Sequence, residues 1–181
     1  MDIKLVHIRL LAQNSPAQSY NLMLYYFNQL QLDGLVKYSY YDGSVKTFND
    51  LYAISLDKTV IFFVLYDCDT NEPVAHVMLN GFEGLTCRGH FCILKKHHGI
   101  HAEYIGNIGR ELIFATKRSN GDPLVTTIVG LTPVKNKIAC RFAQRIGFVK
   151  KFILPQACYL AYDTPEPSYS DGMISVATAA R

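Results

Sequence analysis

Residues 136–148 read Asn-Lys-Ile-Ala-Cys-Arg-Phe-Ala-Gln-Arg-Ile-Gly-Phe. The apolar side chains of this stretch recur at helical spacing, at Ile138, Ala139, Phe142 and Ile146. Such a pattern predicts an amphipathic helix over residues 134–146 that packs its apolar face on a core. Gly147 tolerates the left-handed backbone that commonly ends a helix, so a strand beginning at Phe148 is expected directly after it.

On both sides of this stretch the sequence alternates between apolar runs and helical patterns. Runs of apolar and aromatic residues bounded by turn-forming residues predict strands at 3–11, 60–66, 74–79, 86–94, 124–131, 148–154 and 157–162, the last two separated by Pro155. Amphipathic spacing predicts helices from Ser15 to Gly34, from Thr47 onward and over residues 101–117. The run at 124–131 is almost wholly apolar, which is typical of a strand covered on both faces.

Two of the expected helices begin with a capping-box pattern, in which side chains three residues apart satisfy free backbone N–H groups. Ser15 is followed by Pro16, which suits the first helical position, and by Gln18. Thr47 is followed by Asp50. Both segments are therefore expected to start a helix at these residues.

The composition fits one compact domain. The chain has 181 residues and 49% of them are hydrophobic, which is enough to bury a core without metals or crosslinks. We expect this domain to span residues 1–162. Residues 163–181 are polar and rich in Pro, Ser and Gly, so they predict a loose tail. One hypothesis is that a protein partner or a neighbouring subunit binds this tail and orders it.

Charge and cysteine usage limit the classes of partner and compartment. Charged residues make up 18% of the chain, the net charge is +3, and Lys and Arg are scattered, which argues against nucleic acid as the main partner. The five cysteines lack regular spacing and lie mostly in apolar segments, which favours a reducing, cytoplasmic compartment. No apolar run approaches the roughly 20 residues of a membrane-spanning helix, so neither membrane insertion nor secretion is expected.

The expected order of elements is strand, helix, helix, three strands, helix, strand, helix and two strands, and it resembles that of the GNAT superfamily of N-acetyltransferases. Residues 136–148 resemble this family's late segment, which has Asn, Ala three residues on, an apolar residue at six, and Gly-Phe at eleven and twelve. Any amphipathic helix that ends in Gly could show a similar pattern, so the motif alone leaves this alternative open. The order of elements gives the resemblance independent support. It implies an α/β fold with a mixed, mostly antiparallel central sheet of six to seven strands, flanked by about four helices.

In this family a strand, a Gly-rich loop and the start of a helix bind the pyrophosphate of acyl-coenzyme A, and residues 91–112 resemble that unit. Backbone N–H groups and the helix dipole suit such an anion. The family's loop begins with Gln or Arg and has Gly three residues on and Gly or Ala five residues on, where this chain has Lys96, Gly99 and His101. Only Gly99 matches well, and a solvated basic loop would look the same. The resemblance assigns acetyl-CoA binding to Phe91, Ile93, Lys96, His97, His98, Gly99 and Asn136.

The family's catalytic residues are only partly represented. Many members place a Tyr seven residues after the helix Asn, as general acid for the departing thiolate, and this chain has Ala143 there. Tyr159 and Tyr162 on the final strand are candidates to replace that acid, and His90 on the central strand is a candidate general base. The alternative for His90 is a buried structural histidine, because the sequence identifies no partner for it.

A zinc site is a further alternative, because four possible ligands read as C-x4-C-x4-H-x3-H, at Cys87, Cys92, His97 and His101. Residues five apart on a strand point to opposite faces of the sheet, and the linker is too short for the hairpin and helix of a zinc finger. We therefore expect no bound metal.

Two functions follow from the resemblance. The first is transfer of an acetyl group from acetyl-CoA to an amine substrate, in a slot where the strands at 86–94 and 124–131 part. The second is a non-catalytic structural or interaction protein, which Ala143 and the incomplete loop favour. The sequence also resembles small GNAT-like proteins of tailed bacteriophages, some of them internal virion components, which would place the chain in a host cytoplasm or a virion assembly.

Overall fold

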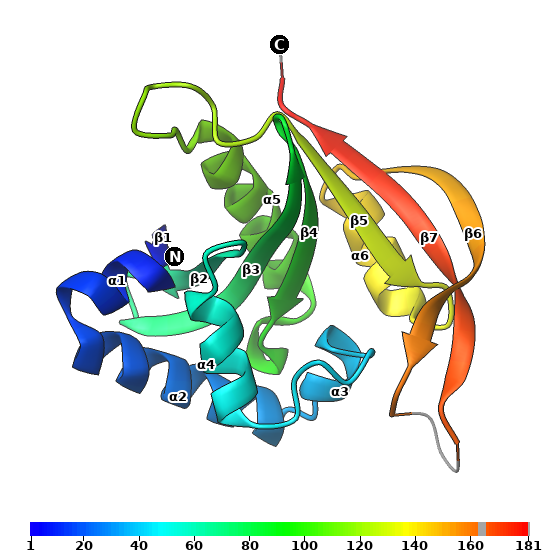
Figure 1. The fold of residues 1–181 in the computed structure, drawn as a ribbon, viewed down its shortest axis with the longest axis horizontal. Helices are drawn as coiled ribbons and strands as arrows, with labels where there is room; N and C mark the ends of the chain where they lie inside the picture. The colour runs from blue at the N-terminus through cyan, green and yellow to red at the C-terminus, as the bar shows by residue number, and fades with distance from the viewer. Residues whose placement is uncertain (163–165, 181) are drawn as a thin grey trace.

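The computed structural model describes residues 1–162 and 166–180, which form a seven-stranded sheet with helices packed against it (Figure 1). The strands are β1 (Ile3–His7), β2 (Ile61–Asp67), β3 (Glu72–Glu83), β4 (Thr86–Ile93), β5 (Thr127–Pro133), β6 (Val149–Leu160) and β7 (Ser168–Thr178). The helices are α1 (Ile8–Asn14), α2 (Pro16–Leu32), α3 (Val36–Ser39), α4 (Phe48–Leu56), α5 (Ile100–Ala115) and α6 (Lys137–Arg145), and a 3₁₀ turn η1 (Lys95–His97) follows β4. The mixed α/β class is the one that the sequence predicts.

The sheet has the order β1-β2-β3-β4-β5-β7-β6, and its neighbouring strands are antiparallel except for β4 and β5. These two parallel strands pair at Thr86–Thr127, Cys87–Ile128 and Arg88–Val129. Beyond those three pairs β4 continues to Ile93 and β5 to Pro133 without pairing, and the strands visibly diverge (Figure 1). The predicted parting of these strands is therefore confirmed.

Two hydrophobic cores lie on opposite faces of the sheet. The α2-side core packs residues of α1, α2 and α4 against alternate strand residues such as Phe62, Met78 and Cys92. The α5-side core packs Ile105 and Ile113 of α5 against the intervening strand residues. Because successive strand residues point to opposite faces, each of β2, β3 and β4 contributes to both cores.

The C-terminal half of the sheet corrects two expectations. Residues 148–162 do not form two strands, because Pro155 lies in a bulge of the edge strand β6, where a missing N–H costs no ladder hydrogen bond. The predicted loose tail is wrong for Ser168–Thr178, which forms β7 and pairs with both β5 and β6. Pairing within the chain thus orders this segment without a partner. The remaining tail residues 163–165 and 181 lie outside the described residues.

Strand β5 corrects a third expectation. The almost wholly apolar run at 124–131 predicts cover on both faces, whereas the β5 residues mostly alternate between buried and partly exposed, as in Ile128 and Val129. Helix α6 packs against β5 and β7 from one side (Figure 1). The second face of β5 is therefore only partly covered.

The N-terminal helices differ from expectation at their boundaries. The first strand ends at His7, whose Nδ1 accepts a hydrogen bond from the Leu10 N–H and caps α1. Ser15 makes no side-chain cap, so its predicted capping box is wrong. The box of Thr47 and Asp50 is confirmed, with the Asp50 N–H donating to Thr47 Oγ1 at 3.3 Å and the Thr47 N–H to Asp50 Oδ2 at 2.8 Å.

The cysteines are free thiols, and the alternation along β4 places Cys87 in the α5-side core and Cys92 in the α2-side core. These two residues therefore point to opposite faces, as expected. Among residues 1–162 and 166–180, no group of three or more His, Cys, Asp or Glu side chains is placed to hold a metal ion. Within the same ranges, no helix is long and apolar enough to cross a bilayer.

Candidate functional site

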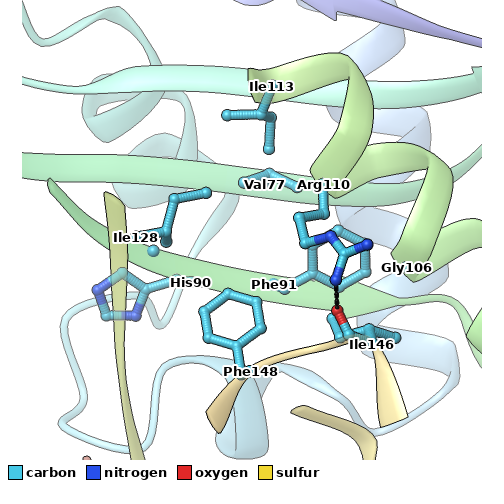
Figure 2. Close-up of a pocket in the computed structure, with 10 residues that line it drawn as sticks. Val77, His90, Phe91, Gly106, Arg110, Ile113, Ile128, Ile146 and Phe148 are labelled. Atoms are coloured by element: carbon cyan, nitrogen blue, oxygen red, sulfur yellow. Dashed lines mark hydrogen bonds between the residues drawn. The ribbon is translucent and has the colours of Figure 1, made fainter. Parts of the chain in front are cut away.

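The divergence of β4 and β5 leaves a small pocket of about 30 Å³ (Figure 2). Its lining comes from β4, β5, α5 and the end of α6, and includes His90, Phe91, Arg110, Ile128, Ile146 and Phe148. A cavity of this size holds roughly one or two water molecules. Side chains therefore fill most of the opening between the two strands.

Two arginines join α5 to the end of α6 beside this pocket. Arg110 Nη1 donates a hydrogen bond to the Ile146 carbonyl at 2.6 Å, as drawn in Figure 2. Arg145 Nη1 pairs with Glu103 Oε1 at 2.9 Å. Gly147 has a φ of 86°, and a Cβ built there would lie 1.8 Å from Arg110 Nη1. Glycine is thus required at 147 both by the backbone and by the guanidinium.

The N-terminus of α5 offers a second element of the site. Gly99 is its N-cap residue, with φ 81° and ψ −132°, a conformation that residues with a Cβ rarely adopt. A Cβ built on Gly99 meets no atom within 4 Å, so the space beside it is open. The helix runs for 16 residues beyond this cap and begins without a side-chain cap. Free N–H groups and the helix dipole make such an end suited to an anion.

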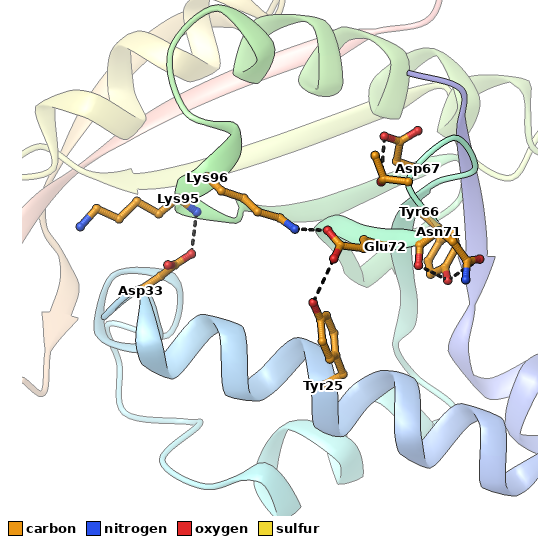
Figure 3. A network of polar contacts seen from close by, with 9 residues as sticks. Tyr25, Asp33, Tyr66, Asp67, Asn71, Glu72, Lys95 and Lys96 are labelled. Carbon is orange, nitrogen blue, oxygen red and sulfur yellow. Dashed lines mark hydrogen bonds and ion pairs between the residues drawn. The ribbon is translucent and has the colours of Figure 1, made fainter.

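The two lysines before Gly99 are held by acidic side chains (Figure 3). The Lys96 ammonium pairs with Glu72, whose carboxylate also accepts a hydrogen bond from the Tyr25 hydroxyl at 3.5 Å. The Lys95 backbone N–H donates to Asp33 Oδ2 at 2.6 Å. An anion at Gly99 would therefore compete with Glu72 for the charge of Lys96.

The two histidines of the loop have different surroundings. His97 is half-buried, and its Nε2 has no hydrogen-bond partner among the described residues. Burial, reinforced by the nearby charge of Lys96, lowers the pKa of His97. His98 Nε2 lies 3.0 Å from the Ile93 carbonyl oxygen, so this nitrogen carries the donated proton. His98 thus donates its hydrogen bond to the last carbonyl of β4.

His90 lies on the other face of β4 from Phe91. Its cross-strand partner is Met78 of the α2-side core. Burial lowers the pKa of His90, with Asp42 opposing this effect and Arg88 adding to it. A lowered pKa keeps the imidazole neutral near pH 7, which is the form that accepts a proton. His90 therefore has the protonation state that a general base requires.

The other predicted residues take local structural contacts. Asn136 caps α6, with its Oδ1 accepting a hydrogen bond from the Ala139 N–H at 3.1 Å. Tyr159 is 42% exposed, and its ring lies 5.5 Å from that of Tyr169. Tyr159 is not among the described residues that line the pocket. Their roles in catalysis and coenzyme binding stay predictions.

A buried polar network near His90 was missed by the sequence analysis. His76 Nδ1 lies 2.9 Å from the Tyr26 hydroxyl, and its Nε2 lies 3.1 Å from the Tyr40 hydroxyl. The Tyr26 hydroxyl also donates to the Cys92 carbonyl at 3.3 Å. One neutral tautomer satisfies every group: His76 Nδ1 donates to Tyr26, and Nε2 accepts from Tyr40. No spacing in the sequence connects these residues, which lie on α2, β3 and the end of α3.

Tyr40 begins a segment that connects the two halves of the sheet. The Ala161 N–H donates to the Tyr41 carbonyl at 2.7 Å. The Tyr162 hydroxyl donates to the Val45 carbonyl at 2.6 Å. The segment 40–45 is thus fixed to β3 through His76 and to the chain after β6, so it spans from one side of the opening to the other. Tyr162, a candidate acid in the sequence, has this structural contact.

A comparison with protein-family models and a comparison with curated protein sequences both found no match. Solved structures do match over nearly the whole chain. The spermidine N-acetyltransferase from Vibrio cholerae, in complex with CoA and spermine, is 16% identical with a TM-score of 0.65, covering 97% of this chain and 95% of that one. The fold is the GNAT fold. The neighbouring solved structures give no support to the resemblance to bacteriophage proteins.

Two further structures with this fold are acetyltransferases of ribosomal proteins. One, from Salmonella typhimurium, modifies the N-terminal serine of 50S ribosomal subunit protein L7/L12; it is 12% identical with a TM-score of 0.73, covering 98% of this chain and 95% of that one. The other is the ribosomal-protein-S5-alanine acetyltransferase from Vibrio fischeri, 11% identical with a TM-score of 0.66, covering 97% and 91%. At such identities the similarity establishes the fold, and activity has to be argued from the site.

Proposed function

We propose that this protein is an acyltransferase that moves an acetyl group from acetyl-CoA to an amine. One observation carries the proposal: β4 and β5 stop pairing after Arg88 and Val129, and α5 begins with the open, positive-φ Gly99 a few residues after β4 ends. An acyl-bearing arm would lie between the parted strands once the side chains that fill the opening move aside. The helix start gives a pyrophosphate a place beside it.

In this proposal the backbone N–H groups at the start of α5 bind the pyrophosphate, and Lys96 adds charge when it leaves Glu72. The pocket of about 30 Å³ is far smaller than the several hundred Å³ of ordinary ligand sites. The arm therefore requires the end of α6, with Ile146 and Phe148, to move away from α5. The Arg110–Ile146 and Arg145–Glu103 contacts are the bonds that resist this movement.

The chemistry requires a neutral amine beside the thioester. The amine nitrogen attacks the carbonyl carbon, the carbon–sulfur bond breaks, and the amine loses a proton as the amide forms. We assign that proton to the neutral imidazole of His90. The departing thiolate takes a proton from water or from Tyr159, because Ala143 supplies none. A strand N–H beside Phe91 polarises the thioester carbonyl.

The acceptor is an amine of a class that the similar proteins suggest. One of them carries spermine beside CoA, and another modifies an N-terminal serine. A polyamine and a peptide N-terminus are therefore the two acceptor classes to test. Both offer a primary amine that is a nucleophile once it is deprotonated.

The decisive experiment measures the melting temperature in a series of acetyl-CoA concentrations, with isothermal titration calorimetry as the direct readout. A ligand that binds only the native state raises the melting temperature once it exceeds its dissociation constant. Release of free CoA thiol is then followed with spermidine and with a peptide that has an N-terminal serine. The proposal is overturned if about 1 mM acetyl-CoA, the weak end of useful affinities, produces no thermal shift and no binding heat.

A further inference from the structure

An apolar surface covers the C-terminal half of the sheet on the side away from α6. We call it the open face; its residues come from β5, β7 and β6 and are Val129, Leu131, Ile174, Val176, Val149, Phe152 and Leu154. The strand register brings them together. Directly paired residues of neighbouring antiparallel strands lie on the same face, so each set of paired residues forms a row across the half-sheet.

The open face consists of two complete rows and one further residue. The first row runs Val129, Val176, Val149. The second row runs Leu131, Ile174, Phe152, and Leu154 lies beyond it opposite Gly172. Three strands therefore present side by side only Val, Leu, Ile and Phe at these positions.

The burial of β7 distinguishes its two faces. Met173, Ser175 and Ala177 are buried, whereas the intervening Ile174 and Val176 are partly exposed. Helix α6 packs against β5 and β7 behind the sheet, and Figure 1 places no described helix in front of these strands. The helices of the α2-side core belong to the other half of the sheet. On this same side Ser170 and Cys158 are buried beside the segment 40–45, which covers that end of the half-sheet. The seven residues of the open face thus form an apolar sheet surface without a helical layer on it.

The charge of the open face restricts what can cover it. None of its seven side chains is charged. Arg88 is opposite Val129 on β4, yet its side chain lies along Gly81 of β3, 3.6 Å from a Cβ built there. An uncharged surface offers no ion pair to a polyamine, a nucleic acid or an acidic peptide. A second apolar protein surface fits it, and like faces meet without charge repulsion.

The area of the open face is in the range of protein contacts. The exposed fractions of its β6 residues are 58% for Val149, 54% for Phe152 and 45% for Leu154. Together these correspond to roughly 250 Å² of surface, taking about 160 Å² for each fully exposed side chain. The four partly exposed residues raise the total to the few hundred Å² that mark interaction sites. Two such faces with their rims approach the roughly 1,000 Å² that a specific interface needs.

We infer that the open face binds the same face of a second copy of this chain. A two-fold axis through the face brings the same patch of both copies into contact, which suits a surface that is apolar throughout. The two half-sheets then pack about 10 Å apart with their strands aligned to within about 30°, as the layers of a β-sandwich do. The inference does not depend on acetyl transfer.

The test measures molar mass by light scattering across a dilution series of the full chain and of three variants. The wild type is expected to have twice the mass of one chain at high concentration. Phe152→Glu buries an unpaired charge in the contact and should weaken the dimer at least about tenfold. Val149→Lys, at a more exposed position, gives an independent disruption. The control Ile138→Glu alters a side chain that is 78% exposed on α6 and should leave the dimer intact.

Circular dichroism and the melting temperature identify any variant that fails to fold, and the other disruptive variant then decides. A wild type that is monomeric at every concentration overturns the inference. So does a dimer that survives both Phe152→Glu and Val149→Lys, since that result assigns the contact to another surface. Loss of the dimer in Ile138→Glu together with its survival in Phe152→Glu would place the contact on α6 instead.

Discussion

The Tyr40 hydroxyl lies 3.1 Å from Nε2 of His76, and the two rings stack with 5.8 Å between centroids and an interplanar angle of 10°. Phe62 stacks against the same imidazole at 5.0 Å. His76 is fully buried among these rings, and burial lowers its pKa to about 3. The residue that fixes the segment 40–45 beside the candidate site is therefore held in its neutral form.

This burial predicts how stability depends on pH. The unfolded chain protonates His76 near the ordinary pKa of 6.5, whereas the native protein does not until about pH 3. The contribution of His76 is therefore complete above pH 6.5 and is lost progressively as the pH falls toward 3. In His76→Gln the slope of unfolding free energy against pH should decrease by up to one proton, or about 1.4 kcal/mol per pH unit.

Urea unfolding at a series of pH values measures this slope. The exposed His101→Gln is the matched control, because its side chain contacts water in both states. An unchanged slope in His76→Gln would mean that the native protein protonates His76 as readily as the unfolded chain does.

Gly99→Leu should abolish acetyl-CoA binding while the fold is kept. A Cβ at this position meets no protein atom within 4 Å, but the Leu side chain fills the open space at the start of α5 and strains a positive φ by about 1–3 kcal/mol. Gly84→Leu is the control, since Gly84 also has a positive φ and open surroundings but lies in the turn between β3 and β4. Calorimetry with acetyl-CoA should separate the two. Equal affinity in both variants would refute the placement of the pyrophosphate at Gly99.

Glu72→Gln should strengthen acetyl-CoA binding. The substitution removes the carboxylate that pairs with the Lys96 ammonium, so the ammonium is free to pair with a phosphate. The pair is partly exposed, so its loss should change the stability by less than about 1 kcal/mol. Glu83→Gln, at the opposite end of β3 from Glu72, serves as control. Weaker binding in Glu72→Gln than in Glu83→Gln would indicate that Glu72 positions Lys96 productively instead of competing for it.

His90→Gln separates a general base from a structural histidine. If His90 accepts the amine proton, the variant should lose about 100-fold in kcat and keep its KM for acetyl-CoA. Because burial lowers the pKa of His90, the acidic limb of wild-type activity should have its midpoint below pH 6.5. Steady-state kinetics with an active acceptor measure both. An acidic limb that persists unchanged in the variant would assign the titration to another group.

How far the sequence predicts this fold depends on where local pattern and tertiary packing agree. The helix around Phe142 and the turn at Gly147 were predictable because their apolar spacing and helix end are local. The helix begins at Lys137 instead of residue 134, however, and Ile138, which was expected on its packed face, is 78% exposed. Strand β7 was missed because Gly172 and Ser175 look like tail residues. In the structure, a Cβ on Gly172 would lie 2.4 Å from Leu131 Cδ1, and the Ser175 Oγ lies 3.0 Å from a Cβ built on Gly130. Residues 172 and 175 are small because side chains of the neighbouring strand lie close to them. A sequence pattern within one strand cannot reveal contacts with another strand.

The candidate site was predictable to the extent that it is a backbone feature. The parting of β4 and β5 and a helix beginning just after Gly99 were expected from the resemblance to the GNAT superfamily, which rests on element order and on short motifs. The pairing of Lys96 with Glu72 joins residues 24 apart, and the contact of Tyr26 with His76 joins residues 50 apart. Contacts at such separations depend on the folded sheet, so the sequence could not indicate them.

Gly147 and Arg110 meet at the contact that holds α6 against α5. Gly147→Ala strains a φ of 86° and forces Arg110 away from the Ile146 carbonyl, because the new Cβ would lie 1.8 Å from Nη1. The variant should lose more than about 2 kcal/mol of stability. In an Arg110→Met background the clash is absent, so the same change should cost only the backbone strain, about 1 kcal/mol. Chemical denaturation of the four proteins gives a double-mutant cycle, and the two residues should couple by about 1 kcal/mol or more. Additive effects would mean that the guanidinium is free to leave the carbonyl without cost, and that this contact does not resist the opening of the slot.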